Sequence, residues 1–180
     1  MNLVAALLMT NKGGDKRMST EDPKNTLDFE VENMNFHRLL VAVDEDDSTS
    51  SIRAFNYAVT LAKTYRVPLA IVTILETGDL NIYDSLSPDV LSDHRQEVLD
   101  KINQYAAKAK DFGVTDVTPL IGEGKPGNII VNKIIPDWRP DLLIVGSETT
   151  DKNRLFIGSQ ASYMAQNAAC SVIVVRANDM

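Results

Sequence analysis

Nearly continuous apolar runs alternate along the chain with longer segments in which apolar residues recur every three or four positions. The runs are Leu39–Val43, Leu69–Leu75, Leu142–Val145 and Val172–Val175. Apolar runs of this length are typical of strands that are covered on both faces. A weaker run, Val117–Ile121, contains Pro119, which has no N–H to donate. We therefore expect this strand at an edge of the sheet.

The segments between the strands have helical spacing. The first apolar stripe consists of Ile52, Phe55, Val59, Ala62 and Tyr65, and the second of Val98, Ile102, Tyr105, Ala109 and Phe112. Ser48–Ser51 offer N-cap side chains for the first helix, and Gly113 follows the second as a C-cap. A short helix over Ile129–Ile135 is expected to stop at Pro136, and a last helix is expected around Ser159–Ala168.

Five strands alternating with helices predict the fold class. Parallel strands need crossover connections, so this order predicts a single α/β domain with a parallel sheet and helices on both faces. The folded domain is expected over residues 36–177. Residues 1–35 are polar and without sustained periodicity, which predicts a disordered tail.

Composition narrows the list of partners and the compartment. The 180 residues carry a formal net charge of −7 and a pI near 4.8, which argues against nucleic acid and anionic membrane as partners. A nucleotide remains compatible, because backbone N–H groups at a helix N-terminus can hold phosphates. The single cysteine, Cys170, precludes an internal disulfide, and no apolar run approaches the roughly 20 residues of a membrane span. The apolar start Leu3–Met9 lacks the basic residues of a secretory signal, so we expect a cytoplasmic protein.

Candidate chemistry follows two of the predicted strands. Asp44 begins an acidic turn after the first strand, whereas Gly146 and Ser147 end the fourth, and Gly158-Ser159 opens the last helix. A glycine at a strand end allows close approach of a ligand, and Gly-Ser at a helix start suits a phosphate. The alternatives are structural: a turn at Gly146, an N-cap at Gly158-Ser159 and a solvated capping turn at Asp44. Neighbouring carboxylates of that turn could also hold Mg²⁺.

Five separated segments resemble the universal stress protein family. They are Leu39–Asp44, Gly124-Lys125-Pro126, Asp141–Ser147, Gly158-Ser159 and Cys170–Val175, and the resemblance covers about residues 36–177. It implies an open, doubly wound sheet of strand order 3-2-1-4-5, with strands one and four flanking the switch point. It also implies a homodimer formed through the last strand, whose apolar residues are Val172, Ile173, Val174 and Val175.

The resemblance further implies an ATP site. ATP-binding members carry Gly-x2-Gly-x9-Gly followed by Ser or Thr, which Gly146 and Gly158-Ser159 match. Thr149 replaces the second glycine, and the loop that follows is one residue shorter. Carried over by position, Val43 and Asp44 meet the adenine or ribose, Ile74 lines the base pocket, and Gly146 lies against the ribose or α-phosphate. Gly158, Ser159 and Gln160 hold the phosphates through their backbone N–H groups. The alternative for Ile74 is simple core packing.

Three functions follow from these residues. The first is a non-catalytic homodimer that binds ATP, with Mg²⁺, in a stress response. The alternative is the same fold without nucleotide binding, acting as a protein-interaction module, which Thr149 and the acidic turn favour. A slow enzyme rests on fold analogy alone. His37 and His94 have no apparent nucleophile partner, and no P-loop is present, so catalysis is not expected.

Overall fold

The computed structural model describes residues 29–44, 46, 48–76, 88–147 and 157–176. The chain divides into two units, Met1–Asn33 and Met34–Met180, and the account below concerns the second. Of the first unit only residues 29–33 are described, and they form no helix or strand. Most of the predicted tail, and the loop that contains Thr149, lie outside the described residues.

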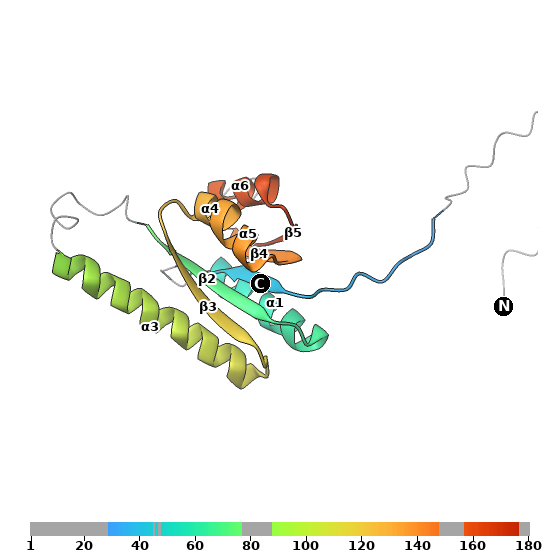
Figure 1. The fold of residues 1–180 in the computed structure, drawn as a ribbon, viewed down its shortest axis with the longest axis horizontal. Coiled ribbons are helices and arrows are strands. Elements are labelled where there is room, and N and C mark those ends of the chain that lie inside the picture. Colours follow the sequence, from blue (N-terminus) through green and yellow to red (C-terminus); the bar gives the residue numbers. More distant parts are fainter. Residues whose placement is uncertain (1–28, 45, 47, 77–87, 148–156, 177–180) are drawn as a thin grey trace, which may run out of the picture. The chain divides into compact units, whose positions relative to one another are not determined.

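Strands and helices alternate through the second unit (Figure 1). The strands are β1 (Leu39–Ala42), β2 (Leu69–Leu75), β3 (Val117–Glu123), β4 (Leu142–Ser147) and β5 (Ser171–Arg176). The helices are α1 (Thr49–Tyr65), α3 (Pro88–Phe112), α4 (Pro126–Ile129), the π-helical turn η1 (Ile130–Ile134), α5 (Ile135–Trp138) and α6 (Ser159–Asn167).

The five strands form one parallel sheet in the order β3-β2-β1-β4-β5. Leu39 at the start of the central strand lies opposite Leu69 on one side and Leu142 on the other. The predicted fold class and strand order are thus confirmed. Pro119 lies in β3 at the sheet edge, as predicted, where a missing N–H removes no bond from a central ladder.

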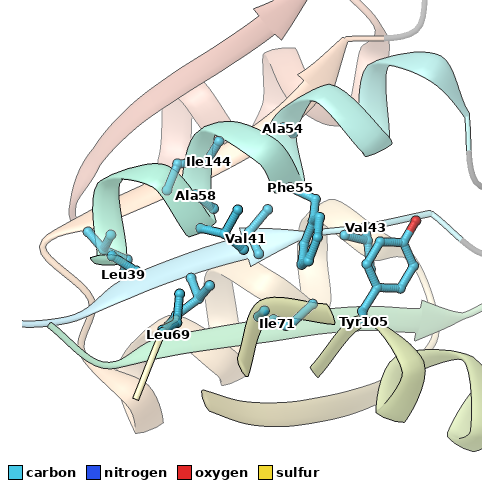
Figure 2. Packing of buried hydrophobic residues seen from close by; sticks show 14 of the residues in the cluster. Leu39, Val41, Val43, Ala54, Phe55, Ala58, Leu69, Ile71, Tyr105 and Ile144 are labelled. Carbon is cyan, nitrogen blue, oxygen red and sulfur yellow. The ribbon is translucent and has the colours of Figure 1, made fainter. Parts of the chain in front are cut away.

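Helices cover both faces of the sheet. On one face, side chains of β1 and β2 pack against α1 and α3, and Figure 2 shows Val41 and Ile71 in the same cluster as Phe55 and Tyr105. The rings of Phe55 and Tyr105 meet edge to face, with centroids 4.9 Å apart. The opposite face, which includes Leu40, packs against the elements from α4 to α6. This doubly covered sheet explains why its central strands are apolar throughout.

The buried face of α1 is rotated from the predicted stripe. Ile52 and Tyr65 are exposed, whereas Ala54 and Ala58 are fully buried beside Phe55. Small side chains allow the helix backbone to approach the sheet closely, so the contact lies along alanines that a search for large apolar residues passes over. The predicted N-cap is confirmed, because Ser48 Oγ accepts a hydrogen bond from the N–H of Ser51.

The predicted stop at Pro136 is wrong. The helical path continues from η1 through α5 to Trp138. At this point the N–H of Ile135 bonds to the carbonyl of Ile130, five residues back, as in a π-turn. The wider turn places Pro136 at the start of α5, where the missing proline N–H is tolerated. The C-cap prediction at Gly113 is confirmed by its φ of 110° and the bond from Val114 N–H to the Ala109 carbonyl.

Candidate functional site

The carboxyl ends of β1 and β4 form the switch point of the sheet. These two strands are hydrogen-bonded neighbours, with Ala42 opposite Val145. The chain leaving β1 enters α1 on one face, whereas α6, which precedes β5, packs on the other face (Figure 1). Connections that part to opposite faces leave room for a ligand at the strand ends.

Asp44 is anchored to the start of α1. Its N–H donates to Ser51 Oγ at 2.9 Å, and its Oδ2 accepts a hydrogen bond from Ser48 Oγ at 2.7 Å. Ser48 in turn caps the helix by accepting from the N–H of Ser51. The capping alternative is therefore present in the structure. The Asp44 side chain is nevertheless exposed at the carboxyl end of β1.

Gly146 has a packing reason to be glycine. A Cβ at this position would lie 2.7 Å from the backbone carbon of Ser50 and 2.8 Å from its oxygen. Backbone atoms cannot move aside as the end of a flexible side chain can, so the close approach of α1 to β4 requires a glycine. This contact explains the glycine without any ligand. It is compatible with the ligand-binding role that the resemblance implies.

Gly158 and Gln160 lie at the start of α6. Gly158 is the N-cap residue, and its N–H donates to Oγ of the buried Ser147 at 3.3 Å. Gln160 Oε1 accepts a hydrogen bond from the N–H of Gly127 at 2.9 Å, so its side chain is directed to α4. Ser159 is exposed, and no side chain of the described residues caps this first turn. The backbone N–H groups of this first turn can therefore hold an anion, whereas the Gln160 side chain is already bonded to Gly127.

Val43 and Ile74 lie on opposite faces of the sheet. Val43 packs with Phe55 and Tyr105 between the sheet and the helices α1 and α3, as Figure 2 shows. Ile74 packs on the other face, where its Cδ1 would be 2.6 Å from a Cβ at Gly122. The contacts of Ile74 are thus those of a core residue.

A pocket of about 180 Å³ opens beside Val43 and Asp44. Its other walls come from the acidic turn, from β2 and from one side of α3. The lining residues beyond those two are Asp46, Thr73, His94, Glu97, Val98, Lys101, Ile102 and Tyr105. The resemblance pointed to Ile74 on β2, whereas the structure brings Thr73 into the pocket. The α3 residues were predicted only as a helix, because no local pattern indicates which turn of a long helix meets a strand end.

The comparisons with known proteins agree with this fold. The family model described as the universal stress protein family matches residues 35–176. The chain belongs to the universal stress protein family. A protein of Staphylococcus aureus (strain USA300) that is named as a universal stress protein is 27% identical over 148 residues, which cover 82% of this chain and 88% of the relative.

Two solved universal stress proteins illustrate the structural likeness. UspA from Lactobacillus plantarum is 24% identical, with a TM-score of 0.68, over 80% of this chain and 100% of the other. A universal stress protein solved in complex with cAMP is 22% identical, with a TM-score of 0.60, over 81% of this chain and 100% of the other. Identities this low establish a shared fold rather than a shared ligand.

Two further findings on this universal stress protein concern metal binding and membrane-spanning helices. Within the described ranges, the structure contains no group of three or more His, Cys, Asp or Glu side chains arranged to hold a metal ion. Among the same residues, no helix is both long and apolar enough to cross a membrane.

Proposed function

We propose that this chain binds an adenine nucleotide at the carboxyl edge of its sheet and acts in a stress response without catalysis. The observation that carries the proposal is that Val43 and Asp44, which the family resemblance assigned to the adenine or ribose, both line the pocket at that edge. The uncapped first turn of α6 offers N–H groups for phosphates at the same edge. The cAMP-bound universal stress protein supports the choice of an adenine nucleotide.

ATP with Mg²⁺ is the form of the ligand that the motif favours. Gly146 and Gly158-Ser159 keep three of its positions, and the N–H groups of the α6 turn would hold the phosphates. Mg²⁺ would neutralise part of the phosphate charge, which matters beside the exposed carboxylates of Asp44 and Asp46.

The test is isothermal titration of the full-length chain with ATP and with cAMP, with and without Mg²⁺. We expect binding with a micromolar Kd. A Gly158→Glu variant provides the control, because Gly158 has a φ of −53° that any residue can adopt, whereas a carboxylate there would repel phosphates. Binding that Gly158→Glu abolishes supports the proposal. The absence of binding by the folded wild-type protein would contradict it.

The second candidate is a protein-interaction module of the same fold that has lost the ability to bind a nucleotide. The acidic lining of the pocket, Asp44, Asp46 and Glu97, favours it because carboxylates repel a triphosphate. Micromolar affinity for ATP would exclude this candidate.

The proposed partner in either case is a second copy of the chain. β5 is the last strand of the sheet order, and Val172, Ile173 and Val174 are only partly buried within one chain. An apolar edge strand is an aggregation risk unless it is covered, so pairing of two β5 strands into a homodimer is physically favourable.

A further inference from the structure

Thr73, which lines the pocket at the carboxyl ends of β1 and β2, carries a buried hydroxyl without a hydrogen-bond partner among the described residues. Thr73 lies on β2, is only 5% exposed and lines the pocket. Its Oγ1 makes no hydrogen bond with any described residue. Most buried polar groups in native proteins are paired, because an unpaired group has lost its water without compensation. A partner supplied by a ligand would remove this cost.

The register of the sheet explains why Thr73 faces the pocket. β1 ends at Ala42, which lies opposite Val72, so Thr73 is one residue beyond the last paired position of β1. Successive side chains of a strand alternate between faces. Ile74 therefore joins the core on the α4 side, whereas Thr73 lies on the α3 side. A change of the χ1 rotamer moves the threonine hydroxyl to another staggered position, which allows Oγ1 to turn to a ligand.

The charges and the size of the pocket indicate which end of a nucleotide it suits. Among the described lining residues, Asp44, Asp46 and Glu97 bring three carboxylates to its walls, against the single ammonium of Lys101. Phosphates are unfavourable there, whereas a neutral base is not. The volume of about 180 Å³ is below the range of about 300–1,000 Å³ in which sites enclose a whole drug-sized ligand. The pocket is therefore of a size for one end of the nucleotide.

We propose that this pocket takes the base of the nucleotide and that the Thr73 hydroxyl forms a hydrogen bond with it. The side chains of Val98 and Ile102 provide an apolar surface for the ring. The phosphates would then lie outside the pocket, away from the three carboxylates. This inference rests on the proposed function, and it names Thr73, in place of Ile74, as the side chain of β2 that recognises the base.

The test is a Thr73→Val variant, which replaces the hydroxyl by a methyl group of similar size. The affinities for adenosine, AMP and cAMP should each fall about three- to tenfold, since all three share the base and lose one neutral hydrogen bond. The melting temperature of the ligand-free protein should stay the same or rise, because an unpaired buried hydroxyl is removed. A loss of binding without a loss of stability distinguishes recognition from a structural role.

Three variants complete the experiment. Thr73→Ser keeps the hydroxyl and should retain most of the affinity. Thr118→Val makes the same chemical change on the edge strand β3, outside the pocket, and should leave binding unaltered. Ile74→Val tests the residue that the resemblance pointed to, and we expect no change in affinity because its side chain packs in the opposite core.

The outcomes separate the two proposals. If the wild-type chain binds nucleotide and Thr73→Val binds it equally well, the role of Thr73 is overturned and the proposed function stands. The same holds if Thr73→Val weakens AMP and cAMP while adenosine is unaffected, because the hydroxyl would then act on the phosphate end. If the folded wild-type chain binds none of the three compounds, the proposed function fails and this inference fails with it.

Discussion

The hydroxyl of Ser147 accepts a hydrogen bond from the N–H of Gly158, at a distance of 3.3 Å. Ser147 is the last residue of β4, and Gly158 is the N-cap of α6. The bond therefore joins the two ends of the segment that carries the altered glycine motif. Ser147 is only 3% exposed, so water does not readily replace the bond.

Replacement of Ser147 by alanine should lower the free energy of unfolding by about 1 kcal/mol, because the Gly158 N–H loses its partner in a partly buried position. Phosphate-bearing ligands should also bind more weakly, since the start of α6 is less firmly held. Urea titration followed by the fluorescence of the single tryptophan, Trp138, measures the first effect. Ser162→Ala, on the same helix, should change stability by much less. Equal effects of the two variants would contradict the role given to Ser147.

Gly146→Ala should destabilise the protein by about 2 kcal/mol, because the new Cβ would overlap backbone atoms of Ser50. Gly122→Ala offers a matched comparison, since its Cβ would approach only the side-chain atoms of Ile74 and Ile129. Ile74 Cδ1 is the end of a side chain and can turn aside, whereas Ile129 Cγ2 must shift with its side chain, so we expect a cost of about 1 kcal/mol. Denaturant midpoints of both variants provide the measurement. A larger loss of stability for Gly122→Ala than for Gly146→Ala would mean that the start of α1 can move away from β4 with little loss of free energy.

Asp141 should make the stability depend on pH. Burial acts to raise its pKa, but hydrogen bonds from the N–H groups of His37 and Arg38, together with the nearby His37 ring, hold that pKa below its ordinary value. A lowered pKa in the folded state means that the carboxylate stabilises the fold above the unfolded value of about 3.9, and that this contribution is lost as the pH falls through the folded value.

Asp141→Asn should therefore cost about 1 kcal/mol at pH 7, a figure reduced because the side chain is 36% exposed and screened by solvent. The difference in unfolding free energy between the two proteins should narrow as the pH is lowered from about 5 to 3. Urea titrations across this range provide the check. A difference that stays constant with pH would show that the charge of Asp141 contributes nothing.

Ile173→Lys should convert the proposed homodimer into a monomer, because a charged side chain on an edge strand blocks strand pairing. Ile173 is partly buried in β5 at one end of the sheet order. Sedimentation velocity distinguishes the two states. Thr118→Lys on β3, at the opposite edge, is the control and should leave the oligomeric state unchanged. If Ile173→Lys sediments with the same mass as the wild-type dimer, the interface does not lie at this strand.

Periodicity and backbone chemistry were sufficient to predict the sheet and several details of its connections. Alternation of apolar runs with helical stripes indicated parallel strands, because each crossover needs a covering helix. Pro119 at an edge, Ser48 at an N-cap and Gly113 at a C-cap each follow from a property of a single residue or of its neighbours. Such properties are local, so they can be recognised along the chain.

The tertiary structure alone decided which side chains share the pocket and which glycines serve packing. Thr73 and Ile74 are adjacent in sequence. Only the pairing of β2 with β1, together with the packing of α3 on the sheet, places Thr73 in the pocket and Ile74 in the core. Gly146 is a strand end in the sequence, and its contact with Ser50 exists only after α1 folds onto β4. The sequence by itself thus determined most of the elements, the family and the carboxyl edge of the sheet at which the site is proposed. The chemistry of that site depends on contacts between distant segments, and these are set by packing rather than by any local pattern.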